Sequence, residues 1–264
     1  MSIDFDTALM RAPGRSVTDG LRAVDRGAPS FDALCDQHAG YRKALEKAGV
    51  IVEMLPALEE FPDSVFMEDP ALVFTEGAIL LRPGAPSRAG EAEALRPALV
   101  ERFARVLDLA EGHADGGDVL VTPHCVYIGL SARTDRTGAA ALVRALAEFG
   151  RHAEVVEPPP GVLHLKTACS LLDEGRLLVT RELLGLPAFA PFERLVVPSG
   201  EEPAANALRV NDVLLLSAGY PRTAEMLAAA GLRVDVLPTT QVALLDAGLS
   251  CLSLRWLRGA GRRT

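Results

Sequence analysis

Short apolar runs recur in pairs along the chain, and a few turn-forming residues separate the two runs of each pair. Runs of this length, rich in Val, Leu and Ile and bounded by turn residues, are typical of β-hairpins. In the first pair the turn is Thr75-Glu76-Gly77. The pattern predicts four hairpins, at residues 71–81, 118–129, 168–180 and 207–217.

Helical periodicity follows three of these hairpins. Apolar residues three and four positions apart lie on one face of a helix, as Leu142, Leu146 and Phe149 would. A similar stretch stands near the N-terminus, and a single apolar strand follows most of these segments. We expect helices at 31–48, 90–109, 136–149 and 221–230, and single strands at 50–55, 152–156 and 233–237.

The order strand, strand, helix, strand therefore repeats about every 40–50 residues. One such unit cannot bury both faces of its sheet alone, so several units must pack side by side. Proline-rich stretches at 56–62, 157–161 and 201–206 are too short to separate domains. We expect one α/β domain over residues 1–264, a closed propeller-like array of ββαβ units whose loops converge near the axis.

Composition narrows the class of partner. The 264 residues are 49% hydrophobic, which is enough for a sizeable core, and the net charge of −8 argues against a nucleic-acid or anionic-membrane partner. No apolar stretch reaches the length of a membrane span, and residues 1–14 lack the basic-then-apolar order of an export signal. We expect a soluble, cytoplasmic protein with a small-molecule partner.

The four cysteines also fit the expectation of a cytoplasmic protein. Cys35, Cys125, Cys169 and Cys251 form no CxxC pair and have no histidine at metal-ligand spacing. Neither a disulfide framework nor a zinc site is therefore predicted. Reduced thiols and a metal-free protein are the expectation.

Cys251 and His164 are candidates for covalent and acid–base chemistry. Cys251 lies in an alternating apolar run, 249–254, that is typical of a half-buried strand, where a cysteine is usually a small core hydrophobe. A reactive thiol would need a nearby cation to lower its pKa. His164 lies in a similar run, 162–166, and a lone histidine there is more often structural than catalytic.

Acidic residues cluster at the starts of two hairpins. Glu68 and Asp69 stand where an apolar strand begins, with Asp63 in the loop before them. At an exposed strand edge they would be ordinary, but burial would require a cation, and a planar guanidinium with five donors meets that need. Asp115 and Asp118 bracket two glycines, which is also the pattern of a simple tight turn.

Two arginines, Arg88 and Arg133, stand in predicted loops. Loop arginines are usually solvated surface charges. Their functional use would be to hold a carboxylate by paired hydrogen bonds, as an amino-acid substrate requires.

Taken in order, these segments resemble the dimethylarginine dimethylaminohydrolases, members of the guanidino-group-modifying superfamily with the pentein fold. The match runs from about residue 11 to residue 256. The residues that carry it are Arg15-Ser16 with Asp19-Gly20-Leu21, FPDSVFMEDP, RPGAPSRAGE, DGGDVL, IGLSART, LHLKT, PAAN, AGYPRT and LSCLSLR.

The resemblance implies a five-bladed α/β propeller with a central site, no cofactor, and hydrolysis of Nω-methylated arginines to citrulline and methylamine or dimethylamine. Cys251 matches the nucleophile and His164 the proton donor and base. Asp115 stands where some bacterial members have Glu to orient that histidine. The family's substrate-binding positions fall at Leu21, Asp63, Glu68, Asp69, Arg88, Arg133 and Leu245, and we group Asp118 with them.

Three alternatives remain open from the sequence. An arginine deiminase uses the same residue types on unmethylated arginine, although such chains are usually longer. A non-catalytic pentein binding protein would not need the retained Cys251 and His164, and metal-dependent hydrolysis lacks a ligand set. Monomer and homodimer are both compatible with the sequence.

Overall fold

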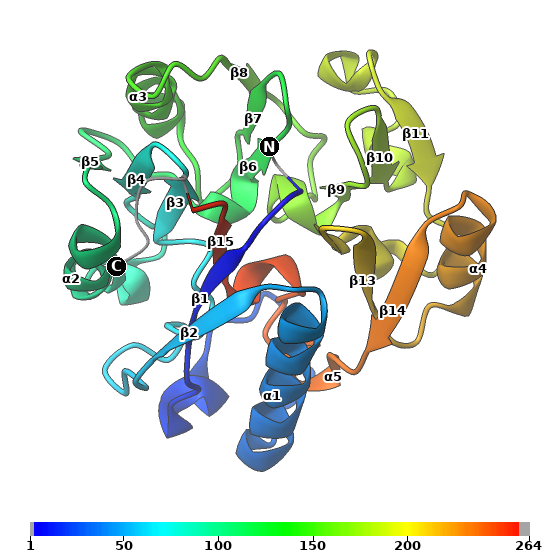
Figure 1. Cartoon of the computed structure of the whole chain (residues 1–264), viewed down its shortest axis with the longest axis horizontal. Coiled ribbons are helices and arrows are strands. Elements are labelled where there is room, and N and C mark those ends of the chain that lie inside the picture. The colour runs from blue at the N-terminus through cyan, green and yellow to red at the C-terminus, as the bar shows by residue number, and fades with distance from the viewer. Residues whose placement is uncertain (1–2, 259–264) are drawn as a thin grey trace.

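Five small sheets of three strands each form a ring in the computed structural model, which describes residues 3–258 (Figure 1). Four blades follow the chain in order. Their strands are β3 (Ala71–Phe74), β4 (Gly77–Leu80) and β5 (Val106–Asp108); β6 (Val119–Val121), β7 (Val126–Gly129) and β8 (Ala153–Val156); β9 (Cys169–Leu171), β10 (Arg176–Val179) and β11 (Glu193–Val196); and β12 (Leu208–Val210), β13 (Val213–Ser217) and β14 (Arg233–Leu237).

The fifth blade closes the ring by joining the two ends of the chain. Strand β1 (Thr7–Arg11) pairs antiparallel with β15 (Leu254–Trp256) and parallel with β2 (Ile51–Leu55). Every blade has this form, with an antiparallel first pair and a parallel outer strand. The five-bladed α/β propeller is therefore confirmed.

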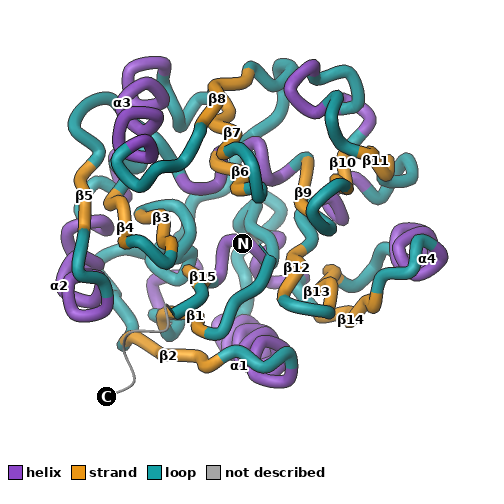
Figure 2. Tube along the Cα trace, turned by 45° about the horizontal axis from the view of Figure 1, so that its top comes forward, coloured by secondary structure: helices purple, strands orange, loops and turns teal. Residues whose placement is uncertain are grey.

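Helices cross from the middle to the outer strand on the outside of the ring (Figures 1 and 2). Right-handed strand twist and the parallel outer pair require such a crossover. The helices are α1 (Phe31–Lys47), α2 (Glu91–Arg102), α3 (Arg136–Ala147) and α4 (Pro221–Ala229), followed by the short α5 (Thr240–Ala243). The third blade crosses through the 3-10 turns Arg181–Leu183 and Pro187–Phe189 instead.

All four predicted hairpins are present, but two predictions need correction. The helix predicted over 90–109 ends at Arg102, because Phe103 is extended and Val106 pairs with Ala78 in the sheet. The run 249–254 was predicted as a strand, but Ser250–Leu252 forms a 3-10 helix and the strand begins at Leu254. In the first place pairing with β4 overrides a local helical pattern, and in the second the turn before β15 overrides local apolar alternation.

Burial follows position within the blade. All residues of the middle strands β1, β4 and β13 are buried, because both faces of these strands are covered. Outer strands leave Ile51, Val155 and Val236 exposed. Among the described residues, no helix has both the length and the apolar run needed to cross a bilayer.

Candidate active site

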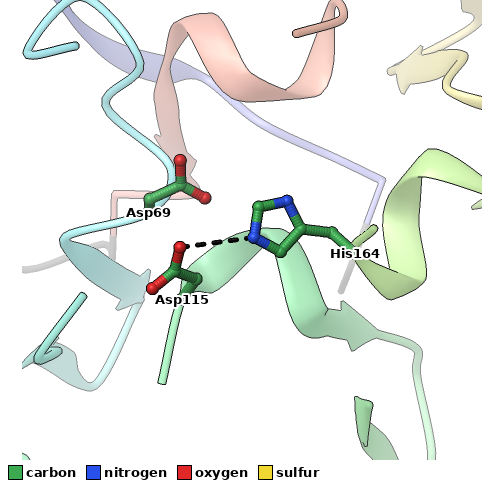
Figure 3. Close-up of side chains that lie close together, drawn as sticks. All are labelled: Asp69, Asp115 and His164. Atoms are coloured by element: carbon green, nitrogen blue, oxygen red, sulfur yellow. Dashed lines mark hydrogen bonds and ion pairs between the residues drawn. The ribbon is translucent and has the colours of Figure 1, made fainter. Parts of the chain in front are cut away.

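Three of the candidate residues from three different blades point toward one another at the middle of the ring (Figure 3). Asp69 precedes β3, Asp115 precedes the 3-10 turn before β6, and His164 precedes the 3-10 turn before β9. Cys251 stands in the same place before β15. Each residue thus sits where the chain enters the first strand of a blade, which explains how distant segments meet.

His164 and Asp115 form the centre of this cluster. The His164 Nε2 atom lies 3.3 Å from Asp115 Oδ2, and Asp115 is fully buried. Burial alone lowers the pKa of His164, but the hydrogen bond to Asp115 and the charges of Asp69 and Asp118 outweigh it and raise the pKa to about 9. The imidazole is therefore protonated at neutral pH and able to donate a proton.

The two glycines after Asp115 let its segment approach the acidic pair. A Cβ atom on Gly116 would lie 1.9 Å from the carbonyl oxygen of Glu68, which no side chain could tolerate. Next to it, the Gly117 N–H donates to Asp69 Oδ1 over 3.1 Å. The close contact that only glycine allows is thus what places Asp69 beside His164.

Asp118 holds the surrounding loops through its two oxygens. Its Oδ1 accepts the N–H of Leu165 over 2.9 Å, which fixes the residue next to His164. Its Oδ2 accepts the hydroxyls of Ser131 and Thr134, over 2.6 Å and 2.7 Å. Burial raises the pKa of this carboxyl. These contacts are those of a residue that positions His164 and the 131–134 loop.

Arg88 is buried and paired, although its sequence context suggested a solvated loop residue. It ends the 3-10 turn Pro86–Arg88, where its guanidinium pairs with Asp69 and binds both oxygens of Glu91. Burial opposes ionisation of Asp69, yet the charge of Arg88 outweighs it and keeps the pKa of Asp69 below its ordinary value. A guanidinium therefore occupies Asp69 in this structure.

Glu91 was not singled out from the sequence. Its spacing of three residues from Arg88, at the first turn of α2, is the signal that could have identified it.

Glu68 is the second buried carboxylate of the pair, and it faces cations from two other blades. Lys166 Nζ lies 2.5 Å from Glu68 Oε1, and Arg255 Nη2 lies 3.3 Å from the same oxygen. Ser250 donates its hydroxyl to Oε2 over 2.8 Å. Glu68 therefore joins the start of β3 to the segment that carries Cys251.

Cys251 lies within the 3-10 turn Ser250–Leu252 and is half-buried. The Glu68 N–H donates to the Cys251 carbonyl oxygen over 3.1 Å, and the Cys251 N–H donates to Gly248. Asn206 holds the preceding residue, since its side chain bonds both the N–H and the hydroxyl of Ser250. Burial first, and then the charges of Glu68 and Asp69, raise the pKa of Cys251 to about 12. The thiol is therefore protonated at neutral pH in this structure.

Four further candidates are Asp63, Leu21, Leu245 and Arg133. Asp63 is buried, and its Oδ1 accepts the N–H of Leu21 over 3.0 Å; burial raises its pKa. Leu245 is buried in the core beside this turn, where a Cβ atom on Gly20 would lie 3.0 Å from Asp63 Oδ1 and 3.3 Å from Leu245 Cδ2. Arg133 is half-buried, and its guanidinium makes no ion pair with any residue from 3 to 258.

The central cluster has the spacing of a cation site as well. One donor atom from each of Asp69, Asp115 and His164 lies within 4.8 Å of the others. In this arrangement, however, Asp69 already pairs with Arg88, and Asp115 accepts from the Gly84 N–H and from His164. The protonated imidazole and the arginine supply the positive charge that the two carboxylates need.

A five-bladed α/β propeller defines the pentein class, and its centre here combines a cysteine, a histidine paired with a buried carboxylate, and acidic residues that face a guanidinium. This is the residue set of the guanidino-group-modifying enzymes. The arginine deiminase family model matches residues 46–195.

Named relatives of this chain belong to the same class of enzyme. The chain is 39% identical to N(G),N(G)-dimethylarginine dimethylaminohydrolase of Pseudomonas aeruginosa, over 96% of this chain and all of that one. The crystal structure of a cysteine-to-serine mutant of that enzyme with citrulline has a TM-score of 0.92, 38% identity, and coverage of 95% and 99%. A dimethylarginine dimethylaminohydrolase adduct with S-methyl-L-thiocitrulline, from a histidine-to-glycine variant, matches with the same TM-score, identity and coverage. The chain belongs to the dimethylarginine dimethylaminohydrolase family.

Proposed function

We propose that this protein hydrolyses Nω-methylated arginines, asymmetric dimethylarginine and monomethylarginine, to L-citrulline and dimethylamine or methylamine. The observation that carries the proposal is the guanidinium of Arg88 on Asp69, beside the His164–Asp115 pair. A site that binds one guanidinium next to a protonated histidine has the chemistry to bind another and to cleave it. The names of the relatives support the substrate class.

Substrate binding exchanges one guanidinium for another. The substrate's cationic head replaces Arg88 at Asp69, where planar hydrogen bonds and opposite charge hold it. Arg88 is then released to bind the substrate α-carboxylate together with Arg133, whose guanidinium is available. We assign the α-ammonium group to Asp63, a buried carboxylate that uses one oxygen for the Leu21 N–H and retains the other.

The arriving cation also activates the nucleophile. Its positive charge opposes the effect of Glu68 and Asp69, so the pKa of Cys251 falls and the thiol releases its proton to solvent. The thiolate attacks the guanidinium carbon and forms a C–S bond. His164 donates its proton to the methylated nitrogen, the C–N bond breaks, and the amine leaves behind a covalent S-alkylthiouronium on Cys251.

The second half of the reaction reverses the role of His164. The neutral imidazole, oriented by Asp115, removes a proton from water, and the hydroxide attacks the same carbon. As the C–S bond breaks, the proton of the new hydroxyl group passes to the departing sulfur, so that citrulline leaves and the Cys251 thiol and protonated His164 are restored. Water supplies the oxygen of citrulline, and no cofactor takes part.

A second candidate is arginine deimination, which the description of the matching family model favours. The two activities differ only in the leaving group, which is ammonia for arginine and an alkylamine for its methylated forms. A non-catalytic pentein would instead bind methylarginine without releasing amine. Citrulline release from asymmetric dimethylarginine, monomethylarginine and plain arginine separates these three functions.

The direct test is mass spectrometry of enzyme stopped during turnover with asymmetric dimethylarginine. We expect an adduct on Cys251, and loss of both adduct and citrulline release in Cys251→Ser. Cys125→Ser is the matched control, because Cys125 is also partly buried but lies in the β6–β7 turn outside the site. Turnover by Cys251→Ser, or a clear preference for plain arginine, would contradict the proposal.

We further propose that the ring works as one domain over residues 1–264 in a cytoplasm. The four cysteines are all free thiols, which suits a reducing compartment. A homodimer stays a prediction, and analytical ultracentrifugation would test it.

A further inference from the structure

The guanidinium of Arg88 is held from three sides, and Asp69 is only one of them. Its Nη1 atom pairs with Asp69. Its Nε and Nη2 atoms form a fork on Glu91, with Nε 3.0 Å from both carboxylate oxygens and Nη2 2.6 Å from Oε2. Nη2 also donates to the carbonyl oxygens of Phe66, over 3.1 Å, and Asp63, over 3.3 Å. A cation that takes Asp69 therefore needs to break the contact at Nη1 alone.

The three charged side chains of this cluster are almost closed to solvent. Those of Arg88, Asp69 and Glu91 are 5%, 8% and 2% exposed. A buried charge that loses its only partner is strongly destabilised, because water does not replace the lost carboxylate. If Asp69 were the only carboxylate on Arg88, a substrate could take it only by leaving that arginine uncompensated. Glu91 supplies a second carboxylate, so the arginine is still paired when its Nη1 contact is lost.

Glu91 has support that does not depend on Asp69. It is the first residue of α2, where the helix terminus favours a carboxylate. Burial lowers the pKa of the nearby Arg11 in β1, and the charge of Glu91 opposes that effect. Burial, with the charges of Asp63 and Asp69, raises the pKa of Glu91 to about 7, although Arg88 lowers it. The carboxylate is therefore ionised above neutral pH.

We propose that Glu91 is a positioning residue for substrate binding, which keeps Arg88 paired and fixed while the substrate's guanidinium displaces Nη1 from Asp69. This role rests on the proposed exchange of guanidinium groups at Asp69. Arg88 does not swing away in the exchange, because its Nε and Nη2 edge stays on Glu91 while Nη1 turns to the substrate α-carboxylate. A ligand that lacks this carboxylate gives Arg88 no new partner, so binding of such a ligand depends most on Glu91.

Calorimetric titration in the Cys251→Ser background measures binding without turnover, near pH 8, where Glu91 is ionised. The two probes are asymmetric dimethylarginine and Nω,Nω-dimethylagmatine, which is the same molecule without the α-carboxylate. We expect Glu91→Gln to weaken binding of dimethylagmatine by at least about tenfold, because Arg88 is then left uncompensated. The loss for dimethylarginine should be smaller, since its carboxylate pairs with Arg88 again.

Glu93→Gln is the matched control. Glu93 lies in the same first turn of α2 but pairs with Arg96 at the surface, so its removal changes the helix terminus without touching Arg88. We expect the Kd of both ligands to stay as in the parent. A second control uses Arg88→Leu, in which adding Glu91→Gln should cause no further weakening, because Glu91 acts through Arg88.

If Glu91→Gln fails to fold, Glu91→Asp replaces it. Its carboxylate is one methylene shorter and loses the fork to Nε and Nη2, so binding of dimethylagmatine should weaken several-fold. Equal weakening of the two ligands, a larger loss for dimethylarginine, or unchanged affinity in the variant that folds would each overturn the role of Glu91. Failure of the parent to bind dimethylagmatine would also overturn it, because Glu91 alone should then compensate Arg88.

The proposed function is decided separately, by citrulline release from the enzyme with Cys251 intact. Binding of dimethylarginine without release would refute that function, and the comparison of the two ligands would still decide the role of Glu91.

Discussion

His164 Nε2 lies 3.3 Å from Asp115 Oδ2, although 49 positions separate the two residues in the chain. Asp115 is fully buried and also accepts the Gly84 N–H, so its carboxylate is fixed from two sides. The hydrogen bond to Asp115, with the charges of Asp69 and Asp118, raises the pKa of His164 to about 9 despite burial. The histidine can therefore act as an acid up to a higher pH than an ordinary imidazole.

Asp115→Asn removes the charged hydrogen-bond partner of His164, which contributes to its raised pKa along with the charges of Asp69 and Asp118. We expect the pKa of His164 to fall from about 9 toward its ordinary value, so that kcat/KM declines at a lower pH than in the wild type. The loss of general-acid catalysis should reduce kcat at neutral pH by roughly 10²-fold. The measurement is the pH profile of citrulline release. Asp115→Glu is the matched variant, and it should retain activity because it keeps the carboxylate; an unchanged profile in Asp115→Asn would contradict the assignment.

The same pair makes stability depend on pH. The pKa of His164 is higher in the folded protein than in the unfolded chain, so its contribution is complete below the ordinary value of 6.5 and is lost as pH rises through about 9. His164→Gln cannot be protonated. The difference in urea midpoint between wild type and His164→Gln should therefore be larger near pH 6 than near pH 10, and an equal difference at both would count against the pair.

Asp69→Asn separates thiol acidity from catalysis. Asp69 helps to raise the pKa of Cys251 to about 12, so its removal should make the free thiol more acidic. The same change removes the group that binds the guanidinium, and kcat/KM should fall by roughly 10²-fold or more. Ultraviolet titration of the thiolate, with Cys251→Ser subtracted, measures the first effect. A variant with both a higher thiol pKa and normal kcat/KM would refute the role of Asp69.

Gly116→Ala tests the close approach of two blades. The new Cβ would meet the Glu68 carbonyl oxygen at 1.9 Å, so the backbone must move. We expect a loss of about 1–3 kcal/mol in the free energy of unfolding, and a larger loss of activity, because Asp69 and His164 shift apart. Gly40→Ala, in α1 with nothing within 4 Å, is the control and should stabilise the protein by up to about 1 kcal/mol. Urea denaturation and citrulline release measure both variants.

Metal removal should leave the enzyme active. The carboxylates of Asp69 and Asp115 are already neutralised by Arg88 and His164, so the proposed reaction needs no divalent cation. We expect full citrulline release after dialysis against a chelator. Activity that is lost and then restored only by added metal would contradict this.

Much of the fold follows from local patterns. The alternation of apolar residues identified all four hairpins, and the ββαβ repeat required a closed array because no single blade can cover its own sheet. The pairing of β1 with β15 was not predictable in the same way, since it joins the two ends of the chain. The strand at Val106–Asp108 was hidden in a helical pattern because its partner β4, rather than its own sequence, decides its conformation.

The sequence by itself identified the residues to which we assign the proposed chemistry: Cys251, His164, Asp115 and the Glu68–Asp69 pair are marked by their types and by the segments around them. Only the tertiary structure decided their states. Burial and neighbouring charges make the free thiol a weak acid and the imidazole a strong base, and both effects depend on distances across blades. Arg88 shows the difference most clearly, because its sequence context suggests a solvated loop while the fold buries it against Asp69 and Glu91.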